Sequence, residues 1–363
     1  MIDQRHMARA LQLARQGIFS THPNPRVGCV IVKDGHIVGE GWHVRAGEPH
    51  AEVYALRQAG ELARGATAYV TLEPCSHHGR TPPCADGLLN AGVARVVAAM
   101  QDPNPQVAGN GLKRLAEAGV VVSCGVLESE ARELNAGFIK LMEQGLPRVR
   151  VKLAMSIDGR TAMANGESQW ITGSAARSMV QRLRAESAAI ITGADGVLHD
   201  GTRLTVRAAE LALDEAQTAL ALSRAPLRVL VDGQRRVPND APFFQAGPAL
   251  IATCTDQPLP ADAEALLLEG EGGKVDLEAL LRSLGKRGIN DVLVEAGASL
   301  AGAFARAGLV DEYWLFMAPK LLGSSARPLL DWPMQSMAQA QDLEISEIRA
   351  VGCDWLIRAT PRR

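Results

Sequence analysis

Strand signals and helix signals alternate along almost the whole chain, and this alternation limits the folds open to it. In RVGCVIVKDGHIVGEGWH, two apolar runs flank Asp34-Gly35, which predicts a β-hairpin. The segment HAEVYALRQAG that follows has helical spacing and ends at a glycine. VARVVAAM and VVVSCG then read as strands, with GNGLKRLAEAG as a helix between them. Such alternation predicts a layered α/β sheet domain.

Three further helices are predicted in the same region. MIDQRHMARALQLARQG has the mixed apolar and charged spacing of an amphipathic first helix. PPCADGLLNAG has prolines at its start and a glycine at its end, as helices often do. LESEARELNAGFIKLMEQG is predicted to form one long helix.

The motif QGLP breaks this pattern, and RVRVKLAMSIDGRTAM then begins a new strand. We therefore predict two domains, of residues 1–146 and 147–363. The second domain repeats the α/β pattern, with strands predicted at AAIITGADG, PLRVLVDG, PALIATC, INDVLVEAG and DEYWLFMAPKLLG. Residues 208–225 and 256–275 give the weakest signals and are predicted surface segments.

The composition is that of an ordinary globular protein and argues against broad nucleic-acid binding. The apolar fraction is 47%, the charged fraction is 21% and the formal net charge is -2. Broad nucleic-acid binding would favour a strongly basic surface. No run approaches the ~20 consecutive apolar residues of a membrane span, and the start lacks the apolar block of a signal peptide. Six cysteines are too sparse for a disulfide framework, which favours a reduced cytoplasmic location.

His50, Cys75 and Cys84 form a predicted zinc site. HAE opens a predicted helix, and the two cysteines flank the loop PCSHHGRTPPC. One imidazole and two thiolates suit Zn²⁺ and leave the fourth position to water, as in catalytic sites. Glu52 lies two residues after the histidine, so it could take a proton from that water and pass it to a leaving amine. The arrangement H-x-E…P-C…C is the signature of zinc nucleobase deaminases.

A structural zinc site is the alternative, because His77 or His78 could supply a fourth protein ligand. Cys29 and Cys124 lie in strand-like runs, so we expect them in the core rather than on a metal. Mere coincidence of HAE with the two cysteines is disfavoured, since each motif falls at the boundary of a predicted element.

The C-terminal half gives weaker signals when its residues are read alone. VEAGASLAGAF, residues 294–304, places a glycine turn between a strand and a helix. Backbone N–H groups at such a helix start could bind a pyrophosphate, although an ordinary strand–turn–helix would look the same. Trp170, flanked by Gln and Thr on a predicted loop, is expected near a pocket. Arg184 and Arg207 could hold a phosphate or could be solvated surface charges.

Taken together, the motifs resemble one enzyme family, the bifunctional riboflavin-biosynthesis deaminase/reductases. THPNPRVGCVIVKDG, GEGWHVRAGEPHAEVYAL, TLEPCSHHGRTPPC and QDPNPQVAGNG are similar to its deaminase half. VKLAMSIDGRTA, GESQWIT, RLRAES, RLTVR, VEAGASLAGA and DEYWLFMAPKLLG are similar to its NADPH-dependent reductase half. The resemblance covers nearly the whole chain. It implies a cytidine-deaminase-like three-layer α/β/α domain followed by a dihydrofolate-reductase-like α/β domain.

For the first domain, the resemblance implies zinc-dependent hydrolysis of the exocyclic 2-amino group of 2,5-diamino-6-ribosylamino-4(3H)-pyrimidinone 5′-phosphate. His50, Cys75 and Cys84 would hold Zn²⁺, with Glu52 as the proton shuttle. The implied substrate contacts are Asn24 for the pyrimidine and His77, His78 and Arg80 near the phosphate.

For the second domain, it implies NADPH-dependent reduction of the ribosyl group of 5-amino-6-(5-phosphoribosylamino)uracil to ribityl. The implied NADPH contacts are Ala154, Trp170, Asp200, Gly297, Ala298, Ser299, Leu300, Ala301, Gly302 and Ala303. The implied substrate contacts are Ser168, Arg184, Leu204, Arg207 and Glu295, and Lys152 is a further implied substrate contact, near the nicotinamide. The expected partners are small phosphorylated pyrimidines, with neither nucleic acid nor membrane, and a homo-oligomer stays open.

The chain departs from the family pattern in the second domain, where GVLHDGTRLTVR replaces a sequence close to TVLADDPxLTVR. Gly196, Gly201, Thr202 and Gly233 are the residues that differ. We therefore expect an active reductase with weaker binding of NADPH. The alternatives are a live deaminase joined to an inactive reductase, a nucleic-acid deaminase with an appended binding domain, and a zinc-stabilised scaffold without activity.

Overall fold

The computed structural model describes residues 2–76, 83–105 and 108–362. The chain folds into two compact units, Met1–Gly145 and Leu146–Arg363. Among the described residues, no helix combines the length and the apolar character needed to cross a membrane.

The first unit is a five-stranded sheet with the strand order β2-β1-β3-β4-β5. β1 pairs antiparallel with β2 and β3, whereas β3, β4 and β5 are parallel. The strands are β1 (Gly28–Lys33), β2 (His36–Trp42), β3 (Thr67–Val70), β4 (Arg95–Ala98) and β5 (Val121–Cys124). The helices are α1 (Ile2–Arg15), α2 (Ala51–Ala59), α3 (Cys84–Asn90), α4 (Asn110–Glu117), α5 (Glu128–Leu134) and α6 (Ala136–Gln144), with a 3-10 turn η1 (Gly60–Ala63).

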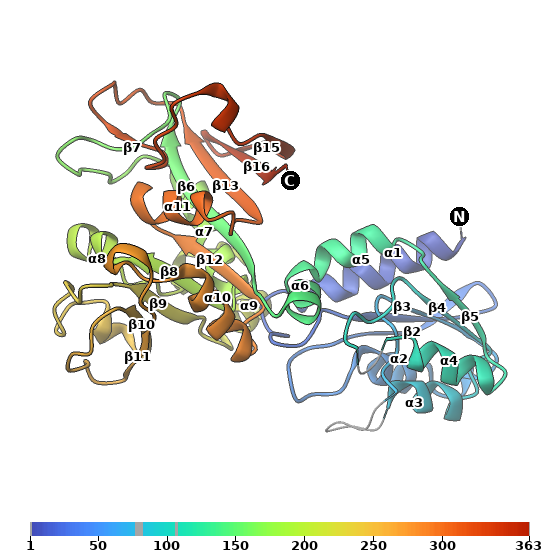
Figure 1. The fold of residues 1–363 in the computed structure, drawn as a ribbon. Coiled ribbons are helices and arrows are strands. Elements are labelled where there is room, and N and C mark those ends of the chain that lie inside the picture. Colours follow the sequence, from blue (N-terminus) through green and yellow to red (C-terminus); the bar gives the residue numbers. More distant parts are fainter. Residues whose placement is uncertain (1, 77–82, 106–107, 363) are drawn as a thin grey trace. The chain divides into compact units, whose positions relative to one another are not determined.

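Helices cover both faces of this sheet, which makes the unit a three-layer α/β/α sandwich. Successive residues of β1 point to opposite faces. Cys29 and Ile31 pack in a core with residues of α2 and α3, and Val30 and Val32 pack in a second core with α1. Figure 1 shows α1 and α5 on one side of the sheet and α2, α3 and α4 on the other.

The predicted hairpin is confirmed: Asp34 and Gly35, both with positive φ, connect β1 to β2. The prediction of one long helix after residue 126 is wrong, because the helix is interrupted at Asn135. Its buried side chain accepts a hydrogen bond from the Arg26 N–H and donates one to the Arg26 carbonyl. Cys29 is fully buried as expected, but Cys124 is exposed at the end of the edge strand β5.

The second unit is built on a nine-stranded sheet with the order β11-β10-β9-β8-β12-β6-β13-β16-β15. All its strands are parallel except β16, which is antiparallel to β13 and β15. The strands are β6 (Arg148–Ser156), β8 (Ala189–Gly193), β9 (Leu227–Val231), β10 (Ala249–Thr253), β11 (Ala263–Leu267), β12 (Asp291–Glu295), β13 (Glu312–Ala318), β15 (Leu343–Val351) and β16 (Asp354–Pro361). A separate pair is formed by β7 (Arg160–Ala162) and β14 (Arg327–Pro328).

Two cores lie against the second sheet. One contains Leu280 and Phe304, from α10 and α11, and the other contains Leu183 and Val197, from α7 and α8. The helices are α7 (Ser174–Glu186), α8 (Ala194–Asp200), α9 (Glu215–Leu222), α10 (Leu277–Lys286) and α11 (Ala298–Arg306). The 3-10 turns are η2 (Ala208–Glu210), η3 (Phe244–Ala246), η4 (Glu271–Gly273) and η5 (Met337–Gln339).

The five strands predicted from apolar runs in this unit are confirmed as β8, β9, β10, β12 and β13. β11 lies in a segment that we expected to be a surface stretch, and the hairpin β15–β16 was not predicted. β15 forms one edge of the sheet and contains a bulge, since Ile345 pairs with Ala359 while Glu347 pairs with Arg358.

Candidate active site

His50, Cys75 and Cys84 come together in the first unit, with their ligand atoms all within 4.8 Å of one another. His50 is the residue that precedes α2, Cys84 is the first residue of α3, and Cys75 follows β3. The Nδ1 atom of His50 lies 3.2 Å from the Cys84 sulfur and 3.7 Å from the Cys75 sulfur. One nitrogen and two sulfurs at this spacing fit the donor set of a catalytic Zn²⁺ site.

The electrostatics of the three groups agree with this role. Hydrogen bonds from Cys84 and then from His50 lower the pKa of the Cys75 thiol to about 4, against the effect of burial. The same hydrogen bond to Cys75, together with burial, raises the pKa of Cys84. The two sulfurs thus share one proton, and a bound divalent cation would displace it, since it would hold both sulfurs as thiolates.

Glu52 lies in the first turn of α2, close to this cluster, and its side chain is 3% exposed. Among the described residues, its Oε2 atom finds no hydrogen-bond partner. Burial raises the pKa of Glu52, while the nearby His50 opposes that rise. A buried carboxylate with one oxygen unsatisfied beside three metal ligands is suited to accept and return a proton.

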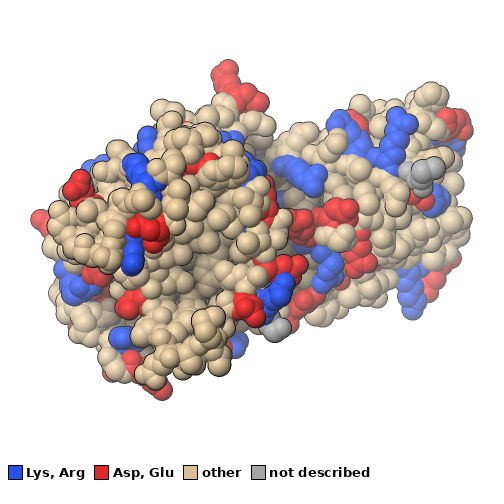
Figure 2. All heavy atoms as spheres, turned by 90° about the horizontal axis from the view of Figure 1, so that it is seen from above, with Lys and Arg blue, Asp and Glu red and all other residues tan. Residues whose placement is uncertain are grey.

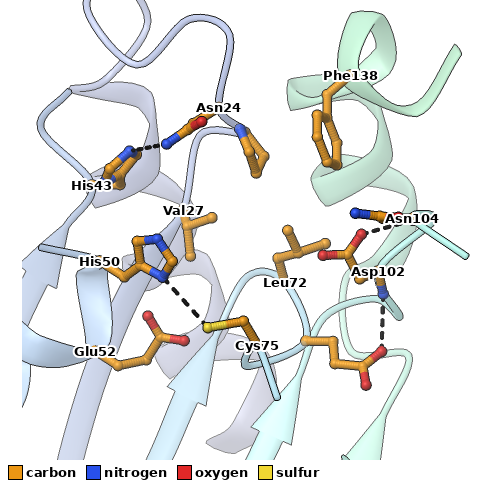
Figure 3. A pocket seen from close by; sticks show the side chains of 12 residues that line it. Asn24, Val27, His43, His50, Glu52, Leu72, Cys75, Asp102, Asn104 and Phe138 are labelled. Atoms are coloured by element: carbon orange, nitrogen blue, oxygen red, sulfur yellow. Dashed lines mark hydrogen bonds between the residues drawn. The ribbon is translucent and has the colours of Figure 1, made fainter. Parts of the chain in front are cut away.

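A cavity of about 220 Å³ opens beside these residues and lies wholly within the first unit. His50, Cys75 and Glu52 line one side of it, while Asp102, Asn104 and Phe138 line the opposite side (Figure 3). The remaining lining residues are Asn24, Pro25, Val27, His43, Leu72 and Glu73.

Hydrogen bonds fix the side chain of Asn24 in this cavity. The Nδ1 atom of His43 lies 3.1 Å from the carbonyl oxygen of Pro49, which can only accept, so Nδ1 bears the proton. Burial lowers the pKa of His43 and keeps the ring neutral, so its Nε2 atom accepts from the Asn24 amide at 3.0 Å. The amide oxygen of Asn24 is thereby left to accept hydrogen bonds from a ligand.

The structure brings Asn24, His50, Glu52 and Cys75 to one cavity, and Cys84 completes the ligand cluster beside it. The predicted substrate contacts His77, His78 and Arg80 lie outside the described residues. The site also contains five residues that were not predicted from the sequence: His43, Glu73, Asp102, Asn104 and Phe138. Two of them, Asp102 and Asn104, lie in the motif QDPNPQVAGNG, which resembles the family but did not indicate a role for any single residue.

In the second unit, Lys152 and Glu295 are neighbours across the parallel strands β6 and β12. Arg184 donates to both oxygens of Glu295, at 2.6 and 2.9 Å, and to the carbonyl of Thr205 at 2.9 Å. Burial lowers the pKa of Lys152, and the charge of Glu295 opposes that shift. A lysine, a carboxylate and a guanidinium are therefore grouped at adjoining strands of one sheet.

The other predicted residues of this half have varied surroundings. Ser168 donates a hydrogen bond to Asp200 at 3.3 Å, which joins a predicted substrate contact to a predicted NADPH contact. Trp170 is 60% exposed and lies against the guanidinium of Arg177, at 4.7 Å. Arg207 is held by Glu210 through two hydrogen bonds.

Leu204 is buried with a positive φ, whereas Ala154 in β6 is partly buried. In the predicted cofactor segment Gly297–Ala303, Gly297 precedes α11 and has open space where a Cβ would be. The exposed start of this helix can accept a phosphate on its N–H groups, so it fits a dinucleotide. Ala301 and Gly302 instead face the interior, where a Cβ on Gly302 would come within 2.5 Å of the Asp331 carbonyl.

Of the residues that differ from the family pattern, Gly201 has a clear backbone reason, and nothing in the structure explains Thr202. Gly201 has a φ of 59° and ends α8, a conformation that favours glycine. A Cβ at Gly196 would lie 3.2 Å from the Thr192 hydroxyl. A Cβ at Gly233 would lie 3.4 Å from both the Cys254 sulfur and the Gly273 carbonyl.

Comparisons with known proteins define the class. The family described as the cytidine and deoxycytidylate deaminase zinc-binding region matches residues 1–100, and the RibD C-terminal domain matches residues 147–357. The protein is thus a zinc-dependent deaminase joined to an NADPH-dependent reductase, on a cytidine-deaminase-like domain and a dihydrofolate-reductase-like domain.

Full-length relatives give the family. The riboflavin biosynthesis protein RibD of Escherichia coli (strain K12) is 56% identical and aligns with 98% of each chain. Two solved structures are also similar over 99% or more of each chain. RibD of Acinetobacter baumannii is 47% identical with a TM-score of 0.92, and a deaminase/reductase from Thermotoga maritima is 32% identical with a TM-score of 0.88. The chain belongs to the RibD family of bifunctional riboflavin-biosynthesis enzymes, and the alternatives raised from sequence are not favoured.

Proposed function

We propose that residues 1–146 form the deaminase domain and residues 147–363 the reductase domain. The first would deaminate 2,5-diamino-6-ribosylamino-4(3H)-pyrimidinone 5′-phosphate. The second would reduce 5-amino-6-(5-phosphoribosylamino)uracil. These substrates are supported by the Thermotoga maritima structure, which is described as a diaminohydroxyphosphoribosylaminopyrimidine deaminase and 5-amino-6-(5-phosphoribosylamino)uracil reductase.

In the deaminase domain, His50, Cys75 and Cys84 hold Zn²⁺ and Glu52 transfers the proton. The observation that carries this assignment is the unsatisfied, buried Oε2 atom of Glu52 beside the three ligand atoms. When bound, Zn²⁺ lowers the pKa of a water molecule and thus supplies a nucleophile at neutral pH. Glu52 takes a proton from the water side of the pocket and returns it to the departing amine.

Asn24 orients the pyrimidine through its amide oxygen, because His43 occupies the amide nitrogen. The phosphate of the substrate is assigned to His77, His78 and Arg80, which lie outside the described residues. The polar wall formed by Asp102 and Asn104 closes the other side of the pocket.

In the reductase domain, Lys152, Arg184, Arg207 and Glu295 face the substrate together with Ser168 and Leu204. NADPH supplies the hydride when bound. Its contacts are Ala154, Trp170, Asp200 and the segment from Gly297 to Ala303, of which the exposed start of α11 offers N–H groups to a phosphate. Arg184 donates to both oxygens of Glu295 from one side of its guanidinium. A substrate phosphate would therefore accept hydrogen bonds from the remaining N–H groups of Arg184.

The decisive experiment follows ammonia release and NADPH oxidation separately, with the diaminopyrimidine phosphate as substrate. Zinc-loaded protein that releases no ammonia would refute the deaminase assignment. Glu52→Gln should lower ammonia release by about 10²–10⁴-fold, because one proton-transfer group is lost. Zinc content and NADPH oxidation on the deaminated intermediate should stay unchanged. Loss of zinc from this variant would mean that Glu52 supports the metal site instead.

We further propose that the protein acts in the cytoplasm on small phosphorylated pyrimidines rather than on nucleic acid. None of the six cysteines forms a disulfide, which suits a reducing compartment. On the face shown in Figure 2, acidic and basic side chains are interspersed rather than gathered in a basic stripe.

We also propose that two copies associate through β15. The bulge in this edge strand brings its apolar residues to one face of the hairpin, here called the apolar hairpin face. Its exposed members are Leu343, Ile345, Ile348 and Trp355, which are 39, 55, 57 and 46% exposed. A second copy of β15, paired antiparallel, would place Ile345 opposite Ile348 and Glu344 opposite Arg349. Apolar residues and opposite charges would then both match across a two-fold axis.

A further inference from the structure

The loop on the far side of the deaminase pocket is held by a single buried carboxylate, that of Glu73, which is 3% exposed. Its Oε2 atom accepts hydrogen bonds from the backbone N–H groups of Asp102, at 3.1 Å, and Gly109, at 2.9 Å. Its Oε1 atom accepts from the N–H groups of Gly111, at 2.8 Å, and Leu112, at 3.3 Å. The backbone of one segment thus uses both oxygens of Glu73.

Three of these four bonds cap the start of α4. The first N–H groups of a helix have no partner within the helix, and a polar side chain at the N-cap usually accepts from them. The N-cap residue of α4 is Gly109, which has a φ of 80° and no side chain. Glu73 lies far upstream in the sequence and supplies the missing acceptor, with a negative charge where the helix dipole favours one.

Close packing ties this helix start to the zinc-ligand segment. A Cβ on Gly111 would come within 1.9 Å of the Pro74 carbonyl oxygen, so only glycine allows the approach. Pro74 lies between Glu73 and the ligand Cys75. The loop that leads into α4 contains Asp102 and Asn104, and the Asn104 N–H donates to the Asp102 carboxylate at 2.8 Å. One short segment, Glu73 to Cys75, therefore holds a metal ligand and anchors the opposite wall.

We propose that Glu73 is a positioning residue for the deaminase reaction, which fixes the distance between the zinc ligands and the wall formed by Asp102 and Asn104. The inference rests on the proposed function of this pocket. Without the four hydrogen bonds, the wall would move away from the ligand cluster, and the substrate would be bound less tightly while the metal stayed in place.

The test is Glu73→Gln, in the full-length, zinc-loaded protein. An amide offers one acceptor oxygen, and its NH₂ group would face backbone N–H donors. We expect KM for deamination to rise about tenfold or more, the factor that accompanies loss of a hydrogen bond to a charged group. We expect kcat to change much less, zinc content to stay the same, and amide hydrogen exchange to become faster at Asp102, Gly109, Gly111 and Leu112. NADPH oxidation on the deaminated intermediate reports whether the second unit remains intact.

Asp86→Asn is the matched control, because Asp86 also links a carboxylate to α4, through an ion pair with Arg114 at 2.7 Å. It lies away from the start of the helix, so KM and amide exchange should not change. Glu73→Asp keeps the charge on a shorter side chain that cannot reach all four N–H groups, so it should also raise KM with zinc retained. If Glu73→Gln does not fold, Glu73→Asp decides the question.

An unchanged KM in the folded variant would overturn the proposal. So would loss of zinc in step with activity, since Glu73 would then support the metal ligands rather than the wall. If the wild-type protein does not deaminate, the proposed function of the pocket fails. Amide exchange would still show whether Glu73 holds the loop.

Discussion

His43 determines which atom of Asn24 faces the substrate. The Pro49 carbonyl fixes the proton on Nδ1 of His43, and the ring then accepts from the Asn24 amide nitrogen. The ring of His43 also meets that of His50 edge to face, at 5.4 Å between centroids. A side chain that kept this packing but lacked the acceptor would free the amide to rotate.

We therefore predict that His43→Phe raises KM for deamination on the order of tenfold, as expected when one oriented hydrogen bond is lost. Zinc content should be unaffected, because the ring of Phe can still pack against His50. Steady-state kinetics and metal analysis check this together. An unchanged KM would show that the orientation of Asn24 does not depend on His43.

The contrast between His50 and His43 shows which site residues a sequence can reveal. His50 and Glu52 are two positions apart at the start of one helix, and Cys75 and Cys84 flank one loop, so local motifs predict all four. His43 acts through Asn24, 19 residues earlier, and Glu73 acts on N–H groups more than 25 residues later. Their roles arise from tertiary contacts, which leave no local pattern.

At the scale of elements, two glycines of β2 allow α2 to lie directly on the sheet. A Cβ on Gly39 would come within 2.1 Å of the Ala55 carbonyl oxygen, and one on Gly41 within 2.3 Å of the Ala51 carbonyl oxygen. Ala51 follows His50, so the contact at Gly41 sets the position of the metal-binding end of the helix.

Gly41→Ala should therefore weaken zinc binding by about tenfold to a hundredfold, the range typical of changes just outside a metal's ligands. Gly39→Ala perturbs the same helix one turn further from His50 and should have a smaller effect. Competition with a chelator measures both affinities. Equal losses in the two variants would indicate general destabilisation rather than displacement of His50.

Elements with strong local signals were predicted correctly, and those shaped by distant contacts were not. The pair Asp34-Gly35 predicts its hairpin because the turn needs a positive φ at both positions, which only a few residue types tolerate. The break at Asn135 depends on hydrogen bonds to the backbone of Arg26, more than a hundred residues away. The apolar spacing continues across Asn135, so the sequence predicted one helix there. β15 was not predicted because its bulge interrupts the alternation of apolar and polar residues that marks a strand.

At the scale of the whole molecule, the apolar hairpin face predicts a homo-oligomer. Ile348→Lys should lower the molar mass measured by light scattering. Each copy would then bury a lysine charge against the apolar residues of the other copy, which is unfavourable. Leu267→Lys is the matched control, because Leu267 is 59% exposed on β11, at the opposite edge of the same sheet. A wild-type protein that is monomeric at micromolar concentration would contradict the proposal, as would dissociation caused by the control alone.

The bulge at Ser346 makes this surface depend on the number of residues in β15 as much as on their kind. With Ser346 present, a regular strand without the bulge would place Ile345 and Ile348 on opposite faces, because they are three positions apart. Removing Ser346 would leave the two isoleucines two positions apart, so strict alternation alone would keep both on the apolar hairpin face. The bulge and the length of β15 thus compensate for each other, and a relative that lacked both Ser346 and the bulge would present the same apolar face from a regular strand.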